Sequence, residues 1–247
     1  MDQSNRVAVV TGASSGIGAA TARRLRAEGF EVYVGARRMD RLRQLASEIG
    51  VRAFPLDVCD RRSVETFAAE IPRCDVLVNN AGGALGLEPV REAIEQHWQT
   101  MWESNVLGLM LVTRAFLPRL DESGAGHIVN IGSIAGFETY AGGAGYAAAK
   151  HAARAVTRTL RLELLGKQIR VTEVNPGLVE TEFSLVRFGD AERARKVYEG
   201  LTPLTGEDIA DCVAWAVSRP WHVNVDEIVV RPVAQATATQ IARNAGL

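Results

Sequence analysis

The sequence predicts a single α/β domain in which a doubly wound parallel sheet of seven strands is covered by helices on both faces. Short apolar runs rich in β-branched residues alternate with helix-like stretches along all 247 residues, and this β-α-β alternation is typical of such sheets. The apolar runs are continuous, as expected for strands that are buried on both sides. The length suits one domain with one large core.

Each strand is expected at a short apolar run, and each helix where apolar residues recur at helical spacing. The predicted strands span residues 6–10, 31–36, 51–58, 75–80, 127–133, 169–175 and 225–230. The predicted helices span residues 16–29, 41–50, 63–71, most of 92–120, 144–165 and 206–218. Gly29 and Gly50 end the first two helices, and Pro55 is tolerated near the end of the third strand. No repeat or linker interrupts the chain, so one domain covers residues 1–247.

Composition and charge limit the possible partners. The formal net charge is −1 and charged residues make up 23% of the chain, which favours neither nucleic acid nor a membrane surface as a partner. The first ten residues contain one apolar run that is too short for a signal peptide, and no run approaches the roughly 18 apolar residues of a membrane span. We therefore expect a cytoplasmic protein that recognises a small molecule locally.

Cysteine and histidine spacing predicts no metal site. The three cysteines, Cys59, Cys74 and Cys212, form no CxxC pair, and the four histidines show no ligand spacing. We expect the cysteines to be core or surface thiols.

Polar or unusual residues follow most of the predicted strands. They are Thr11-Gly12, Ala36-Arg37, Asp57, Asn79-Asn80, Ser133 and Asn175-Pro176. Sheets of this kind bind ligands outside the carboxyl ends of their strands. The ligand site is therefore expected along this edge of the sheet.

A glycine-rich turn joins the first strand to the first helix. The stretch TGASSGIG places glycines at 12, 16 and 18, where they allow a sharp turn, close approach to a phosphate and tight packing of helix on strand. The helix that follows offers free N–H groups to a pyrophosphate. A tight βα connection is the plain alternative, but the position between strand and helix favours dinucleotide binding and a Rossmann fold.

The end of the second strand predicts which dinucleotide is bound. An NAD site usually carries an acidic residue there to hold the ribose 2′-hydroxyl, whereas this chain has Ala36 followed by Arg37 and Arg38. Arginine donors match a phosphate. We therefore expect NADP(H) rather than NAD(H), with both arginines on the 2′-phosphate; the alternative is a solvated helix start.

The stretch YAAAK places Tyr146 and Lys150 one helical turn apart on the same face. An ammonium about 5–6 Å from the phenol would favour phenolate by roughly 3 kcal/mol at an effective dielectric of about 20, before any opposing cost of burial. Such a tyrosine can act as an acid or base near neutral pH. The alternative is an amphipathic helix with a core tyrosine and a solvated lysine. Ser133, at the end of the fifth strand, and Asn105 are further candidates.

Together these motifs resemble those of the short-chain dehydrogenase/reductase family, and they occur in order along the whole chain. The resemblance implies that Tyr146 is the general acid or base and that Lys150 lowers its pKa and holds the nicotinamide ribose. It implies that Ser133 orients the substrate carbonyl and that Asn105 positions a water that relays protons to Lys150. The cofactor-binding residues that we predict are Gly12, Ser14, Ser15, Gly16, Ile17, Gly18, Arg37, Arg38, Asp57, Val58, Asn79, Ala81, Gly82, Tyr146, Lys150, Pro176, Gly177, Val179 and Thr181.

The substrate is predicted from less specific features. Residues 182–205 are expected to form a mobile lid, where Arg187 either holds a carboxylate or belongs to a solvated helix. GLEP, YAGG, TEFSLVRF and RPWHVNVDEIVVRPVAQ resemble the NADP-dependent 3-hydroxy acid/serine dehydrogenase branch, which implies a small hydroxy acid held by Ser133, Tyr146 and Arg187. The alternative is a bulkier ketone, aldehyde or secondary metabolite against the apolar lid residues Phe183, Leu185, Val186 and Phe188.

Two other functions are disfavoured, and an oligomer is expected. A non-enzymatic NADP(H) sensor would be expected to lack Tyr146 or Lys150, and a sugar-nucleotide epimerase would need more chain after Asn175. The family resemblance implies a homotetramer or homodimer. The helix at 144–165 and the C-terminal strand with its tail are the expected interfaces.

Overall fold

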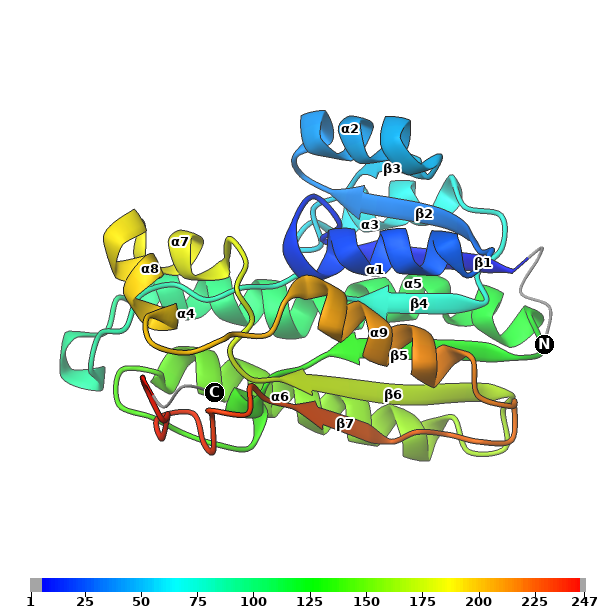
Figure 1. The fold of residues 1–247 in the computed structure, drawn as a ribbon. Helices are drawn as coiled ribbons and strands as arrows, with labels where there is room; N and C mark the ends of the chain where they lie inside the picture. The colour runs from blue at the N-terminus through cyan, green and yellow to red at the C-terminus, as the bar shows by residue number, and fades with distance from the viewer. Residues whose placement is uncertain (1–5, 245–247) are drawn as a thin grey trace.

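The computed structural model describes residues 6–244 and contains the predicted seven-stranded parallel sheet, in the order β3-β2-β1-β4-β5-β6-β7 (Figure 1). The strands are β1 Val7–Thr11, β2 Glu31–Ala36, β3 Arg52–Pro55, β4 Val76–Asn79, β5 Gly126–Ile131, β6 Ile169–Pro176 and β7 Glu227–Val230. The main helices are α1 Gly16–Ala27, α2 Met39–Ile49, α3 Arg61–Ala69, α4 Glu95–Trp102, α5 Gly108–Glu122, α6 Ala144–Glu163, α7 Phe183–Phe188, α8 Ala191–Tyr198 and α9 Gly206–Val217. The predicted fold class is confirmed.

Both faces of the sheet are buried under helices. Alternate side chains of β1 enter different layers: Ala8 and Val10 pack with α1, α2 and α9, whereas Val7 and Val9 pack with α3, α5 and α6. This arrangement explains why the strand sequences are continuously apolar. It also leaves the strand ends as the places where polar groups reach solvent.

The helix predicted over 92–120 is interrupted. The structure has α4, then a π-helical turn at Glu103–Leu107, then α5. Asn105 lies in this widened turn and its Nδ2 donates to the carbonyl oxygen of Met101 at 2.8 Å. Such π turns insert one residue into a helix and re-aim the side chains there, an effect that hydrophobic periodicity does not reveal.

The third strand is shorter than the predicted range of 51–58. β3 is an edge strand and ends at Pro55, which lacks the N–H needed to continue pairing. One hydrogen bond to the neighbouring strand follows the proline: the Leu56 N–H donates to the carbonyl oxygen of Ala36 at 3.1 Å.

The segment predicted as a lid forms two short helices, α7 and α8, beside the carboxyl ends of the strands (Figure 1). They are joined by a 2.8 Å hydrogen bond between the hydroxyls of Ser184 and Tyr198. The C-terminal tail reaches the same segment: the Asn244 N–H donates to the carbonyl oxygen of Gly200 at 2.7 Å, and Arg243 bonds the carbonyl oxygen of Glu199. Within residues 6–244, no helix is long and apolar enough to cross a membrane.

Candidate active site

A cleft of about 840 Å³ runs along the carboxyl edge of the sheet and under α7. All the predicted site residues line it except Gly18, Asn79 and Asn105. Residues from six strand ends and the lid therefore meet at one edge, where the sequence placed the ligand site.

The glycine-rich turn is packed too tightly for side chains. Gly12 has a φ of +69° and Gly16 a φ of +53°, a region that favours glycine. A Cβ at Gly18 would lie 2.4 Å from Nδ2 of Asn80 and 2.5 Å from the carbonyl oxygen of Gly12. The absence of a side chain at Gly18 therefore allows the turn to pack closely against Asn80, although Gly18 does not line the cleft.

The two asparagines of NNAG point in different directions. Asn79 is buried, and its Nδ2 donates to Thr113 Oγ1 and Asn130 Oδ1, both at 2.9 Å. Asn80 lines the cleft, and its Nδ2 donates to the carbonyl oxygen of Thr11 at 2.9 Å. The cofactor role of Asn79 stays a prediction, and Asn80, which was expected at this edge of the sheet without an assigned role, lines the cleft.

Arg38 is held against the glycine-rich turn. Its Nη2 donates to Ser15 Oγ at 2.7 Å and to Ser14 Oγ at 3.1 Å. Its Nη1 forms an ion pair with Glu182 at 2.8 Å, and Arg41 pairs with the other oxygen of that carboxylate at 2.5 Å. The hydrogen bonds from Arg41 and Arg38 lower the pKa of Glu182 to about 2. Arg37 is exposed and lines the cleft beside them.

Asp57 and Val58 form the wall of the cleft next to the arginines. The carboxylate of Asp57 accepts the N–H of Cys59 at 3.0 Å, while its own N–H donates to Ser63 Oγ at 2.9 Å. These contacts fix the loop after β3. Asp57 itself lines the cleft, as expected for one of the predicted cofactor-binding residues.

At the other end of the cleft, α6 presents Tyr146 and Lys150 to the end of β5. The ammonium nitrogen of Lys150 lies 5.9 Å from the centroid of the Tyr146 ring and donates to the carbonyl oxygen of Ile131 at 2.9 Å. Ser133 lies beside the phenol, and its Oγ accepts the N–H of Ala135 at 3.1 Å. These three groups are brought together as predicted.

Burial dominates the electrostatics of these groups. It raises the pKa of the Tyr146 phenol, while the Ser133 hydroxyl and the charge of Arg187 act in the opposite direction. Burial also lowers the pKa of Lys150 to about 8, and the carboxylate of Glu173 opposes this. The sequence reasoning counted the charge of Lys150 near the phenol but could not weigh desolvation.

Asn105 lies behind the cleft rather than on its surface. Its Nδ2 donates to the carbonyl oxygens of Gly83 and Met101, each at 2.8 Å. Its Oδ1 is buried without a hydrogen-bond partner within residues 6–244, and a Cβ on Gly82 would lie 2.6 Å from it. The predicted water-positioning role of Asn105 stays a prediction.

Arg187 places a cation over the tyrosine. Its Nε donates to the carbonyl oxygen of Gly86 at 2.9 Å and its Nη1 to the Tyr140 hydroxyl at 3.0 Å. The guanidinium carbon lies 5.7 Å from the centroid of the Tyr146 ring, and Phe183 packs against the same ring at 5.5 Å between centroids. The lid therefore brings one charged and one aromatic group to the phenol.

Residues 6–189 match the short chain dehydrogenase family. The chain belongs to this family. The shared region runs from β1 to α7 and contains the glycine-rich turn and the tyrosine-lysine pair.

Several relatives of this short-chain dehydrogenase match over nearly its whole length. The chain is 58% identical over 238 residues to an uncharacterized oxidoreductase of Mycobacterium tuberculosis, covering 96% of this chain and 95% of that protein. It is 46% identical over 240 residues to an NADP-dependent 3-hydroxy acid dehydrogenase of Salmonella typhi, covering 94% and 97%. The closed form of a serine dehydrogenase complexed with NADP⁺ superposes with a TM-score of 0.92 at 42% identity, covering 96% of this chain and 99% of that one.

Several cleft residues of this short-chain dehydrogenase were not predicted as site residues, and three of them make contacts that shape the cleft. Tyr140 and Gln235 line the cleft, as does Glu182, which is paired with Arg38 across 144 positions of sequence. The Gln235 Oε1 accepts the N–H of Leu178 at 2.9 Å and so fixes the loop after β6. All three lie in stretches that resemble the 3-hydroxy acid/serine dehydrogenase branch, Tyr140 in YAGG, Glu182 in TEFSLVRF and Gln235 in RPWHVNVDEIVVRPVAQ, but none of them was assigned a role.

We predict that Gly18→Ala lowers the free energy of unfolding by about 1–3 kcal/mol, because the new methyl group overlaps Asn80 and the Gly12 carbonyl. Urea unfolding measures this. The matched control is Gly83→Ala, where nothing lies within 4 Å of the new Cβ and the change should stay below about 0.5 kcal/mol. Equal effects of the two substitutions would contradict the packing argument.

Proposed function

We propose that this short-chain dehydrogenase is an NADP(H)-dependent enzyme that interconverts small 3-hydroxy acids and the corresponding carbonyl compounds. The observation that carries this proposal is the guanidinium of Arg187, held 5.7 Å from the ring of Tyr146. A substrate that places its reacting oxygen on the phenol would have a cation within reach for a carboxylate.

The cleft fits NADP(H) on its own residues. Gly12 and Gly16 form a cradle that side chains would fill, at the start of α1. Ala36 stands where an acidic residue would hold an unphosphorylated ribose, and Arg38 lies directly on the serines of the turn. The 46% identical relative is named NADP-dependent, and the similar serine dehydrogenase carries NADP⁺. These likenesses support the same cofactor here.

The protein residues supply position and a proton. When bound, the nicotinamide cofactor would supply or accept the hydride. In carbonyl reduction the Ser133 hydroxyl holds the carbonyl oxygen and Tyr146 donates its phenolic proton to that oxygen; in oxidation Tyr146 takes the proton back. The raised pKa of Tyr146 keeps the phenol protonated, which suits the acid role. Lys150, with a pKa of about 8, provides the nearby positive charge and holds the ribose.

The bulkier substrate that was the alternative remains a second candidate, because Phe183 packs on the Tyr146 ring. Of the other apolar lid residues, Val186 and Phe188 line the cleft, whereas Leu185 is 44% exposed and lies outside it. The positive charge of Arg187, whose guanidinium is held by the Tyr140 hydroxyl, favours a substrate that carries a carboxylate, as the hydroxy acid does.

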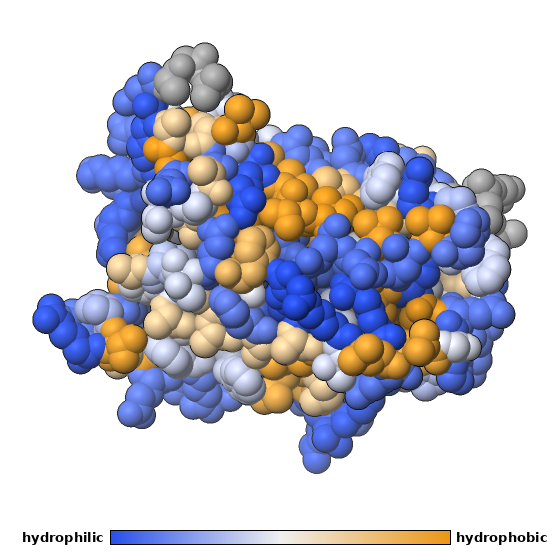
Figure 2. Space-filling model, turned by 90° about the horizontal axis from the view of Figure 1, so that it is seen from below, coloured by the Kyte–Doolittle hydropathy of each residue, from blue (hydrophilic) through white to orange (hydrophobic). Residues whose placement is uncertain are grey.

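We also propose that the protein works as a homotetramer or homodimer in the cytoplasm. Large apolar side chains are exposed on α4, at the end of α6, on α9 and after α9; they are Trp98, Trp102, Leu162, Leu165, Trp215 and Trp221. Figure 2 shows apolar patches separated by charged side chains on one face. Such patches are typical of association surfaces, and two of them adjoin the predicted interfaces.

Arg38→Ala should weaken NADPH binding roughly ten- to hundredfold and leave NADH binding nearly unchanged, because charge-assisted hydrogen bonds to the 2′-phosphate are lost. Fluorescence titration with both cofactors measures this. Arg41→Ala is the matched control, because Arg41 bonds the same Glu182 but does not line the cleft. An equal loss for NADH would count against the assignment.

Tyr146→Phe should keep the fold and NADPH affinity but lower turnover by about 10³-fold or more, because the proton donor is lost. Absorbance at 340 nm with L-serine, 3-hydroxypropanoate and 3-hydroxyisobutyrate measures it. Near-normal turnover in this variant would refute the catalytic role.

Arg187→Met should raise KM for these hydroxy acids at least about tenfold while sparing a neutral secondary alcohol of similar size. Arg193→Met is the control, because Arg193 is an exposed residue of the same lid, its guanidinium carbon lies 5.0 Å from the centroid of the Phe188 ring, and it does not line the cleft. Equal losses on acid and alcohol would favour the bulkier, uncharged substrate class.

A further inference from the structure

The face of β6 that is turned toward α6 carries two buried polar side chains, and the proposed reaction does not yet use them. Glu173 is 1% exposed and Asn175 is 0% exposed. Their neighbour Val174 packs in the layer of α1 and α9, whereas these two side chains face α6 and the end of β5. Polar groups are buried at such a depth only at a cost, which their partners must offset.

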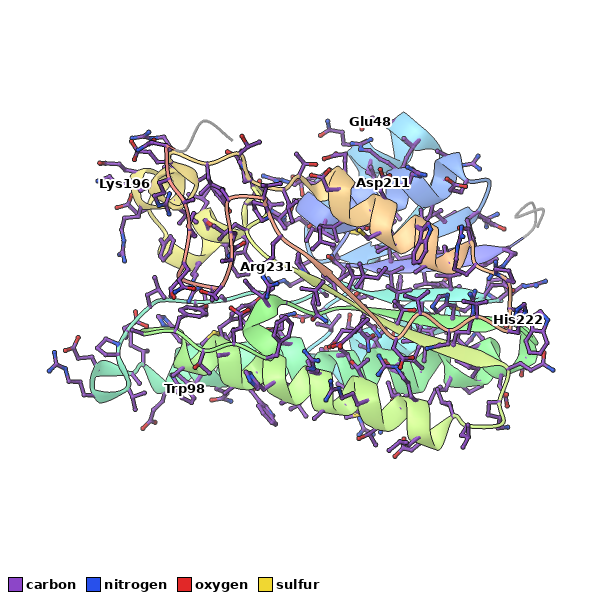
Figure 3. All side chains as sticks on the ribbon, turned by 60° about the horizontal axis from the view of Figure 1, so that its bottom comes forward. Glu48, Trp98, Lys196, Asp211, His222 and Arg231 are labelled. Carbon is purple, nitrogen blue, oxygen red and sulfur yellow. The ribbon has the colours of Figure 1, made fainter. Side chains whose placement is uncertain are left out.

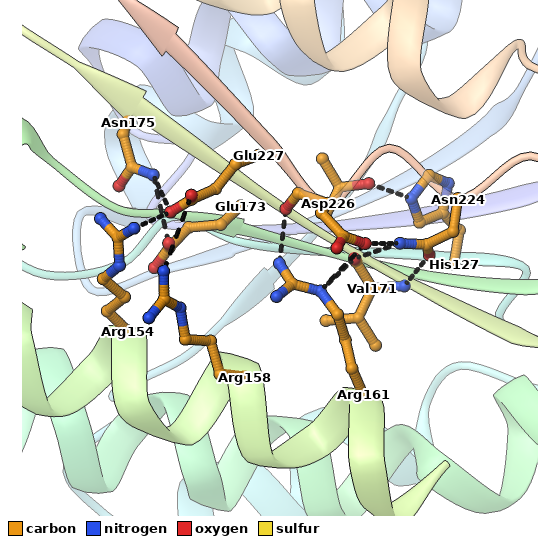
Figure 4. A network of polar contacts seen from close by, with 11 residues as sticks. His127, Arg154, Arg158, Arg161, Val171, Glu173, Asn175, Asn224, Asp226 and Glu227 are labelled. Atoms are coloured by element: carbon orange, nitrogen blue, oxygen red, sulfur yellow. Dashed lines mark hydrogen bonds and ion pairs between the residues drawn. The ribbon is translucent and has the colours of Figure 1, made fainter. Parts of the chain in front are cut away.

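Asn175 holds the backbone of Ser133. Its Oδ1 accepts the Ser133 N–H at 3.0 Å, and its Nδ2 donates to Glu173 Oε2 at 3.1 Å and to Glu227 Oε1 at 3.4 Å. Figure 4 shows the amide between the two acidic side chains and the ribbon of β5. Because an oxygen atom of each carboxyl group accepts the amide N–H, the two groups fix which end of the amide faces Ser133.

The side chains of Asn175 and Glu173 also pack closely against Gly132. A Cβ at Gly132 would lie 2.0 Å from Asn175 Oδ1 and 3.2 Å from Cγ of Glu173. On one side of Gly132 stands Ile131, whose carbonyl oxygen accepts the Lys150 ammonium, and on the other stands Ser133. The segment that holds both proposed catalytic groups therefore lies directly on Glu173 and Asn175.

The charges around Glu173 come from two elements. Helix α6 contributes the cations Lys150, Arg154 and Arg158, and β7 contributes the carboxyl group of Glu227. Glu227 pairs with Arg154 at 2.6 Å and with Arg158 at 3.9 Å (Figure 4). Burial raises the pKa of Glu173, its hydrogen bond with Asn175 opposes this, its hydrogen bond with Glu227 adds to it, and the charge of Arg154 opposes it. Arg154 thus acts on both carboxyl groups, and Glu173 in turn opposes the lowering of the Lys150 pKa.

We propose that Glu173 and Asn175 are positioning residues of the active site: Asn175 fixes the backbone at Ser133, and the Glu173 carboxylate orients Asn175 and supplies the negative charge that faces Lys150. The proposal rests on the proposed roles of Ser133 and Lys150. A purely structural role, joining β6 to β7 and α6, is the competing explanation.

The charge of Lys150 can be measured without any substrate. The sequence contains three lysines, Lys150, Lys167 and Lys196. The latter two are exposed and form surface ion pairs with Asp121 and Glu192, and Figure 3 shows Lys196 on α8. An NMR titration of the full chain with ¹³C-labelled lysine therefore has two internal controls.

Glu173→Gln is expected to lower the midpoint of the Lys150 signal by at least about half a pH unit, because the charge that opposes desolvation is removed. The two surface lysines should not shift, and Glu173→Asp should restore most of the midpoint. An unchanged Lys150 midpoint in Glu173→Gln would overturn the counter-charge role. This result does not depend on which substrate the enzyme uses.

Asn175→Leu tests the second half of the proposal. We expect kcat to fall roughly ten- to hundredfold with an unchanged affinity for NADPH. Thr172→Val is the matched control: Thr172 is equally buried on the opposite face of β6, where it bonds His127 at 2.8 Å. Equal losses of kcat and of thermal stability in both variants would reduce Asn175 to a structural residue. If Asn175→Leu does not fold, the near-isosteric Glu173→Gln decides through the Lys150 titration.

Discussion

Burial of the central sheet on both faces is the constraint on which the rest of the structure depends. With α1, α2 and α9 on one side and α3, α5 and α6 on the other, nearly every side chain along a strand must be apolar. Groups that perform chemistry can then gather only where strands end. The glycine-rich turn, the arginines after β2 and Ser133 after β5 all obey this rule, and they form one continuous cleft.

Several polar side chains enter the layers, and most of their hydrogen-bonding atoms are engaged, although Asn79 Oδ1 and His127 Nδ1 have no partner within residues 6–244. Asn79 links β4 to β5 and α5 through Asn130 and Thr113. His127 bonds Thr172, and Glu173 meets Asn175. Buried polar networks of this kind specify one arrangement of neighbouring elements, because a displaced partner would leave an unpaired group in a medium of low dielectric. They hold the cleft walls at fixed distances from one another.

Much of this architecture could be predicted from local pattern, since apolar runs and glycine positions report directly on burial and turns. β2 was predicted with the bounds observed, and the tyrosine-lysine pair was placed correctly on one helix. What the sequence could not predict depends on contacts distant in sequence. Glu182 pairs with Arg38 only because the lid folds back. Asn80 lines the cleft while Asn79 bonds Thr113 and Asn130, and Phe183 of the lid packs on the ring of Tyr146. None of these has a periodic signature.

The C-terminal tail has a practical consequence for handling the protein. Gln235 secures the loop after β6, and Arg243 and Asn244 bond the backbone that follows α8, so residues 235–244 are tied to the predicted lid. Val7 begins β1 at the amino ends of the strands, opposite the end that carries the cleft (Figure 1). A fluorophore attached near Asn244 would therefore report on the predicted lid, whereas the same label near Val7 would be remote from it.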